Sequence, residues 1–264
     1  MPNLDSHKAG AFCWVELGTT DQNAAKNFYS ALFGWSSNDH PMGPNGVYTV
    51  FRLQDRDAAA AYTLRPDQRS HNVPPHWMLY VAVDNADAAA QRATQLGAHV
   101  LAPAFDVMDL GRMAVIQDPT GAMFSVWQAR NHSGTGITAV PGTLCWCDLN
   151  THDQSGARKF YSDLFGWKTT DDTDDNPSSG YVHIQNGQDF IGGILPSAYV
   201  PPHVPPHWMP YFLVANCDAS LAKAKELGAK VYMKPQTLEE VGRFAIVADP
   251  QGAGFAIFQA NPRR

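Results

Sequence analysis

The sequence predicts an α+β fold in which two similar domains follow each other along the chain. The first observation is an internal repeat, because residues 10–35 and 142–167 align without gaps and are identical at 15 of 26 positions. The second is another pair of matching blocks, 73–129 and 204–260. The third is that apolar strand-like segments alternate with amphipathic helices in each copy. Copies of about 130 residues have the size of whole domains, whereas solenoids are built from at least three shorter units.

The elements of the first copy follow in the order strand, helix, strands, and then again strand, helix, strands. Asp21 is a suitable N-cap for a helix with one apolar stripe, and Gly97 ends a second helix over residues 86–96. A tight turn, Asp118-Pro-Thr-Gly121, separates the last two strands and predicts a hairpin. The expected strands are 12–17, 48–53, 58–63, 77–83, 112–117 and 122–128. The second copy repeats this order, with its turn at residues 249–252.

A segment rich in small residues and proline joins the copies. It covers residues 131–142 and has the composition of a linker. We therefore expect a first domain over residues 1–134 and a second over residues 135–264.

Composition limits the possible partners. The 264 residues include 19 Lys and Arg against 25 Asp and Glu, a net charge of −6 without a basic cluster, which argues against nucleic acid or an anionic membrane. No apolar run has the length of a spanning helix, the first residues are polar, and the four cysteines form no CxxC pair. We expect a cytoplasmic protein with a small-molecule partner, either a monomer whose halves pair within the chain or a homodimer.

The repeated motifs resemble a known superfamily. Two βαβββ modules, with D…FY…LFGW after the first strand and DPxG before the last, are similar to the vicinal oxygen chelate superfamily. It includes glyoxalase I, extradiol dioxygenases and bleomycin-resistance proteins. The finer motifs CWVEL, PPHWM and GRxAxxxDPxG resemble a two-domain subgroup that includes a mycobacterial antigen. The resemblance implies two tandem domains, each a curved, mostly antiparallel sheet around a cavity.

The resemblance also implies where a metal would bind. Members that use a divalent ion place ligands at three positions, on the first, fifth and last strands of a domain. In this sequence those positions hold Trp14, Met78 and Ser125 in the first copy, and Trp146, Met209 and Ala256 in the second. None of these side chains is a good ligand for such a cation. We therefore expect no cofactor, and a divalent metal is possible but disfavoured.

A relocated catalytic or metal site is an alternative. Glu16 lies two residues from Trp14 and His76 two from Met78, so each pair shares a strand face. Asp148 and His207 repeat the pattern in the second copy. These four residues are the candidate catalytic groups, because an acid and a histidine suit proton transfer. The competing interpretation puts both acids in solvent at a strand end and lets both histidines stabilise the Pro-Pro turn.

The remaining candidates would bind a ligand by stacking and charge. If the metal-type positions face a cavity, Trp127 and Phe258 line it as well. A two-residue hairpin loop would place Arg112 opposite Trp127, with Arg243 beside Phe258, where a guanidinium could clamp an anion. The competing interpretation pairs this arginine with a nearby acid. The predicted ligand-binding set is Trp14, Met78, Arg112, Ser125, Trp127, Trp146, Met209, Arg243 and Phe258.

Three functions follow from these patterns. The first is a metal-independent protein that binds a small aromatic or amphipathic molecule between aromatic walls. The second is an enzyme of the glyoxalase, dioxygenase or isomerase type, with a relocated metal or with acid–base residues alone. The third is a non-catalytic interaction protein whose cavities are filled by large side chains.

Overall fold

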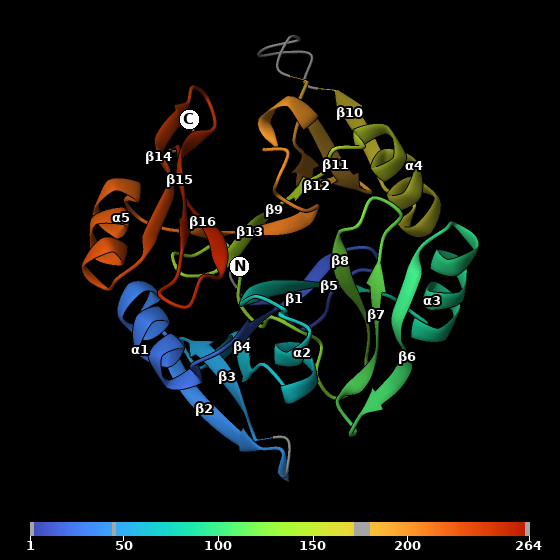
Figure 1. Cartoon of the computed structure of the whole chain (residues 1–264), viewed down its shortest axis with the longest axis horizontal. Coiled ribbons are helices and arrows are strands. Elements are labelled where there is room, and N and C mark those ends of the chain that lie inside the picture. Colours follow the sequence, from blue (N-terminus) through green and yellow to red (C-terminus); the bar gives the residue numbers. More distant parts are fainter. Residues whose placement is uncertain (1–2, 44–45, 172–179, 262–264) are drawn as a thin grey trace.

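The computed structural model describes residues 3–43, 46–171 and 180–261, which form two eight-stranded sheets (Figure 1). The elements of the first domain are β1 (Phe12–Thr19), α1 (Gln22–Phe33), β2 (Ser36–Pro41), β3 (Val47–Leu53), β4 (Arg56–Thr63), α2 (Pro66–Ser70), β5 (His76–Ala82), α3 (Ala86–Gln95), β6 (His99–Val107), β7 (Gly111–Gln117) and β8 (Met123–Ala129).

The second domain repeats this order with a 3₁₀ turn in place of α2. Its elements are β9 (Leu144–Asn150), α4 (Gln154–Phe165), β10 (Lys168–Asp171), β11 (Val182–Asn186), β12 (Asp189–Ile194), the 3₁₀ turn η2 (Ser197–Tyr199), β13 (His207–Leu213), α5 (Cys217–Glu226), β14 (Lys230–Leu238), β15 (Gly242–Ala248) and β16 (Gly254–Ala260). In the part of the chain that the structure describes, no helix is long and apolar enough to cross a membrane.

Both sheets have the predicted topology of paired modules. The strand order is β2-β3-β4-β1-β5-β8-β7-β6 in the first domain, and the second sheet has the corresponding order. Only the pairs β1–β4 and β5–β8 of the first sheet are parallel, and the others are antiparallel. The predicted fold of two tandem, mostly antiparallel domains is therefore confirmed.

Local signals in the sequence explain the helix that opens each domain. The Asp21 side chain accepts a hydrogen bond from the Ala24 amide, and Gly34 ends α1 in the left-handed conformation. Asp153 and Gly166 do the same for α4. Each helix is thus fixed at both ends by a residue of the repeated motif.

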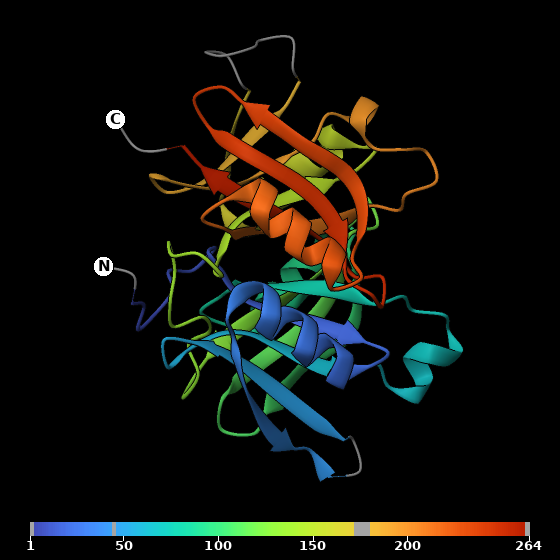
Figure 2. The same cartoon turned by 90° about the vertical axis from the view of Figure 1, so that its left-hand side faces the viewer.

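One core joins the two domains. The helices α1, α3, α4 and α5 cover one face of each sheet, and their apolar stripes pack together with those faces into a single cluster of buried side chains. α1 lies beside α5 and α3 beside α4, so each helix pair comes from both domains (Figure 1). The second domain stacks on the first when the molecule is viewed from the side (Figure 2). The opposite face of each sheet is outside this core and carries a separate cluster of side chains.

The motifs that recur in both copies meet at this domain contact. The Tyr29 hydroxyl donates to Asp249 at 2.9 Å, and the Tyr161 hydroxyl donates to Asp118 at 2.8 Å. Trp77 and Trp208 donate their indole N–H groups to Tyr29 and Tyr161. The tyrosine of each FY motif therefore reaches the aspartate of the other domain's DPxG turn, which holds the two halves in a pseudo-symmetric pair.

The hairpin before the last strand differs from the prediction by one residue. Gln117 pairs with Met123, and the Asp118 carboxylate accepts the amides of Thr120, Gly121 and Ala122 in a longer loop. Because side chains alternate along a strand, a shift of one residue moves each of them to the other face. Arg112 consequently lies opposite Gln128, and the predicted register that placed it opposite Trp127 is wrong.

Candidate functional site

The faces away from the helices bring most of the predicted positions together. Trp14 lies opposite Tyr80, and Tyr80 lies beside Ser125, so these residues form one row across the first sheet, with Glu16 and Met78 in the next row. We call this surface the Trp14 face; it comprises Trp14, Glu16, Tyr48, Met78, Tyr80, Met123, Ser125 and Trp127. The corresponding Trp146 face comprises Trp146, Asp148, Tyr181, His183, Met209, Tyr211, Phe244, Ala256 and Phe258.

Glu16 is enclosed by tyrosines. Its two carboxyl oxygens accept hydrogen bonds from the hydroxyls of Tyr48 at 2.8 Å and Tyr80 at 3.0 Å. The Trp14 indole N–H donates in turn to the Tyr48 hydroxyl at 3.1 Å. The expectation that this acid lies in solvent at a strand end is therefore wrong, because aromatic hydroxyls surround the carboxyl.

Asp148 holds the same place with a side chain one methylene shorter. It accepts from Tyr181 at 2.6 Å and from the Trp146 indole at 2.9 Å, and it is 5% exposed. Tyr181 reaches this shorter acid across Gly193, where a methyl group would overlap the tyrosine hydroxyl. In the first domain Ala60 lies beside Glu16 at the matching place. The longer acid, Glu16, is thus paired with an alanine on the neighbouring strand, and the shorter acid, Asp148, with a glycine.

Burial raises the pKa of both carboxyls. For Glu16, the hydrogen bonds from Tyr48 and Tyr80 oppose this shift without cancelling it. For Asp148, the opposing contributions come from Tyr181, Tyr211, Trp146 and the charge of His183. Each face therefore holds an acid that takes up a proton more readily than it would in water.

The two predicted histidines are bound to the chain itself. His76 Nδ1 lies 2.8 Å from the Pro74 carbonyl oxygen, and His207 Nδ1 lies 2.9 Å from that of Pro205. Burial lowers the pKa of both imidazoles. These contacts are those of a turn-stabilising histidine, and the structure shows no direct bond from either ring to Glu16 or Asp148 within the described residues.

The side chains at the three metal-type positions do not fit a divalent ion. Trp14 and Trp146 offer an indole N–H that donates only, and Met78 and Met209 offer a soft thioether. Ser125 is fully buried, its hydroxyl has no hydrogen-bond partner among the residues that the structure describes, and Ala256 takes its place in the second domain. Among the described residues, no three His, Cys, Asp or Glu side chains gather closely enough to hold a metal.

Arg112 and Arg243 lie on the helix side of their sheets, which corrects their predicted place in the ligand site. Arg112 forms ion pairs with Asp87 at 2.7 Å and Asp106 at 3.0 Å, and Arg243 pairs with Asp218 at 2.9 Å. The register of the hairpins is the physical reason, because Met113 and Phe244 occupy the positions opposite Trp127 and Phe258. The competing interpretation, in which this arginine pairs with a nearby acid, describes the structure.

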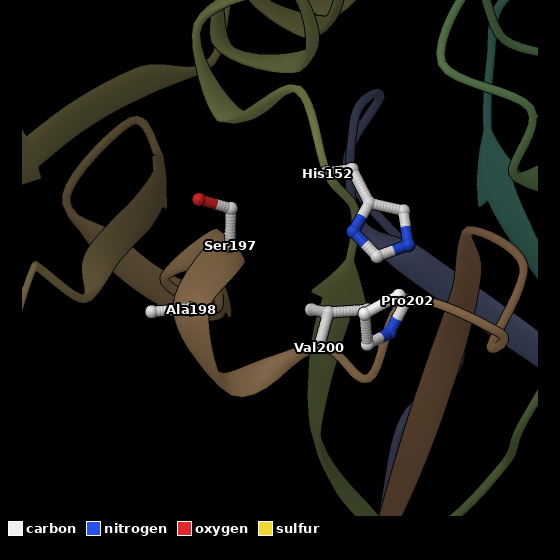
Figure 3. Close-up of a pocket in the computed structure, with 5 residues that line it drawn as sticks. All are labelled: His152, Ser197, Ala198, Val200 and Pro202. Carbon is white, nitrogen blue, oxygen red and sulfur yellow. The ribbon is translucent and has the colours of Figure 1, made fainter.

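Two open depressions lie elsewhere on the surface. The first, about 550 Å³, lies between His152 and the turn η2, and Figure 3 shows the imidazole beside Val200 and Pro202 with Ser197 across from it. The second, about 360 Å³, lies between the linker and the β3–β4 turn, and His132 and Asp57 are among its lining residues. Neither is lined by any of the nine predicted ligand-binding residues.

Sequence reasoning missed the aromatic partners of the two acids. Tyr48, Tyr80, Tyr181 and Tyr211 each face Glu16 or Asp148. A signal was present for two of them, since Tyr80 and Tyr211 lie two residues after the methionines on the same strand face. Tyr48 lies on β3 and Tyr181 directly precedes β11, and only the sheet order shows that they reach the acid.

Comparison with known proteins agrees with this geometry. The family model "Glyoxalase/Bleomycin resistance protein/Dioxygenase superfamily" matches residues 12–126 and again residues 143–257. A curated relative named "Putative glyoxylase CFP32", from Mycobacterium bovis, is 39% identical and is matched over the full length of both chains. The "Anthracycline biosynthesis protein DnrV" of Streptomyces peucetius is 35% identical, with 95% of this chain and 93% of that protein covered.

Solved structures show the same fold at low identity. The Mn(II)-bound glyoxalase from Novosphingobium aromaticivorans has a TM-score of 0.66 at 17% identity, covering 96% of this chain and 82% of that one. The 2,3-dioxygenase LapB from Pseudomonas sp. KL28 has a TM-score of 0.65 at 14% identity, covering 97% and 95%. With the family model matching both halves, the chain belongs to the glyoxalase, bleomycin-resistance protein and dioxygenase superfamily.

Proposed function

We propose that this protein binds a small, planar aromatic molecule without the metal chemistry of its superfamily. The observation that carries the proposal is the recurrence, in both domains, of an indole at the first metal-type position beside a buried acid held by tyrosines. Indole and phenol rings bind planar ligands by stacking and edge contacts. The donor-only indole nitrogens and the thioethers at the metal-type positions are poor ligands for a hard divalent ion.

The relatives support an aromatic ligand. Two proteins at 34–35% identity are named for anthracycline biosynthesis, a process whose products are polycyclic aromatic molecules. In this proposal Glu16 and Asp148, with the tyrosines hydrogen-bonded to them, fix the orientation of the aromatic side chains that contact the small-molecule ligand.

The proposal is tested by titrating the protein with dihydroxyanthraquinone and with aminoacridine after treatment with a chelator. Quenching of tryptophan fluorescence and direct calorimetry should both show saturable binding. Absence of binding to every planar aromatic compound in a broad panel would contradict the proposal and favour faces that are filled by their own side chains.

A second candidate is acid–base catalysis of the glyoxalase or isomerase type. The raised pKa of the Glu16 carboxyl and of the Asp148 carboxyl favours it, since an acid that retains its proton at higher pH suits proton transfer. The assay is isomerisation of the hemithioacetal of methylglyoxal and glutathione, with and without added Mn²⁺. Turnover that is lost in both Glu16→Gln and Asp148→Asn and is independent of the metal would support this candidate.

A further inference from the structure

The interdomain linker lies across the Trp14 face. The Trp127 indole donates to the His132 carbonyl at 2.9 Å, and the His132 ring meets the Trp14 ring edge to face at 4.8 Å between centroids. The Thr135 amide donates to the Cys13 carbonyl at 2.7 Å. A side chain at Gly134 would overlap that carbonyl, so the linker lies directly on β1.

Further contacts hold this segment in place. His132 Nε2 lies 3.4 Å from an Asp57 carboxyl oxygen, and the Gly136 amide donates to the Asp57 carbonyl. On the outer side, His7 Nε2 lies 2.9 Å from the Thr135 carbonyl oxygen. As a result Trp14 and Trp127 are only 5% and 7% exposed. A stacking ligand could reach these rings only after the linker had moved.

The Trp146 face is more accessible. Trp146 and Phe258, which correspond to Trp14 and Trp127, are both half-buried, as is Phe244 beside them. The position of the Trp127 indole N–H, which binds the linker in the first domain, is taken by a phenylalanine that cannot donate. The aromatic surface that is covered in the first domain is therefore partly exposed in the second.

Additional rings extend this second surface. His183 contacts the rings of Tyr181 at 5.1 Å, Trp146 at 6.1 Å and Phe190 at 5.3 Å, and Phe190, near the start of β12, is 53% exposed. In the first domain the place of His183 is held by Val50, which pairs with Ala60 as His183 pairs with Gly193. The second face thus offers an imidazole ring where the first offers an aliphatic side chain.

Charge also distinguishes possible ligands. The residues that define the Trp146 face include one acid, Asp148, one histidine, His183, and neither lysine nor arginine. Such a surface has no permanent cation to hold an anion, and it favours neutral or cationic planar molecules because aromatic faces attract cations.

We propose that the Trp146 face is the working ligand site of the chain, that it takes a neutral or cationic planar aromatic molecule, and that the linker closes the Trp14 face. This inference rests on the proposed function and adds which of the two faces performs it.

The test measures aminoacridine binding to the full chain by fluorescence anisotropy, with anthraquinone sulfonate as the anionic counterpart in calorimetry. We expect one aminoacridine per chain. Trp146→Leu and Phe258→Leu should each weaken binding roughly three- to tenfold, the loss of one aromatic contact. The control variant Tyr199→Leu, which removes an exposed ring on η2 outside both faces, should leave the affinity within about twofold. Phe258 makes no hydrogen bond through its ring, so its variant tests the site even if Trp146→Leu folds poorly.

The contrary outcomes separate the two proposals. Two bound molecules per chain, or a loss of affinity in Trp14→Leu with none in Phe258→Leu, would overturn the assignment to the Trp146 face and leave the proposed function intact. Equal affinity for anthraquinone sulfonate would overturn the charge preference. Failure of both probes and of the wider aromatic panel would contradict the proposed function itself.

Discussion

Replacing Gly193 with alanine should break the hydrogen-bond cluster around Asp148. The added methyl group overlaps the Tyr181 hydroxyl, which must withdraw from the carboxyl that it contacts at 2.6 Å. A hydrogen bond to a charged group contributes about 2 kcal/mol, so Gly193→Ala should lower the free energy of unfolding by about that amount. Urea denaturation followed by circular dichroism measures this difference from the midpoint and slope.

The first domain supplies the control for this prediction. There a longer acid, Glu16, lies beside Ala60, so the double variant Asp148→Glu with Gly193→Ala converts the second site into the first one's combination. It should be more stable than the sum of the two single variants predicts, by roughly 1 kcal/mol. The reasoning is refuted if Gly193→Ala costs less than about 0.5 kcal/mol, the usual effect of a neutral surface change, or if the two changes are simply additive.

Three further changes test the domain contact and the corrected arginines. Tyr29→Phe leaves Asp249 without its cross-domain donor and should lower the free energy of unfolding by about 1–3 kcal/mol in urea denaturation. Tyr161→Phe is the matched change at Asp118. No change in either variant would show that these contacts do not hold the two domains together. Burial raises the pKa of Asp249 in the folded chain, so this carboxyl stabilises the fold at low pH, and its contribution is lost as the pH rises from about 4 through the raised folded pKa. Relative to Asp249→Asn, the wild-type chain should therefore become less stable across this pH range. The opposite trend in unfolding measured against pH would contradict the prediction. Arg112→Ala should leave the affinity for anionic and neutral aromatic probes unchanged in calorimetry, because this side chain pairs with Asp87 on the helix side of the sheet, and a selective loss for anions would restore it to the ligand site.

The repeat and its caps made most of the fold predictable. Asp21 and Gly34 mark the ends of α1 in the sequence, and runs of apolar residues after a Pro-Pro pair and after the DPxG turn mark β5 and β8. The strand β2 was not located, because all six of its side chains are exposed and show no alternation. Its position follows from pairing with β3, which is a tertiary property.

The site was harder to predict because it depends on register and on neighbouring strands. Counting along β1 correctly placed Trp14 beside Glu16 on one face, since that argument uses only the two-residue period of a strand. The prediction of the face on which Arg112 lies required the exact length of the hairpin loop. The Asp118 carboxylate accepts three amides of this loop, which is one residue longer than the register predicted from the sequence requires. The closing contact of His132 on Trp14 joins segments more than a hundred residues apart, and no local pattern reports it.

The most direct test of the account is the metal dependence of aromatic binding. Aminoacridine affinity should be measured on chelator-treated protein and again after addition of Mn²⁺, with Phe258→Leu measured in parallel. The account predicts the same affinity in both conditions and the same weakening by the variant. Binding that occurs only with the metal would contradict this account. It would show that the chain holds a cation, for which Trp14, Met78, Ser125 and their counterparts are poor ligands.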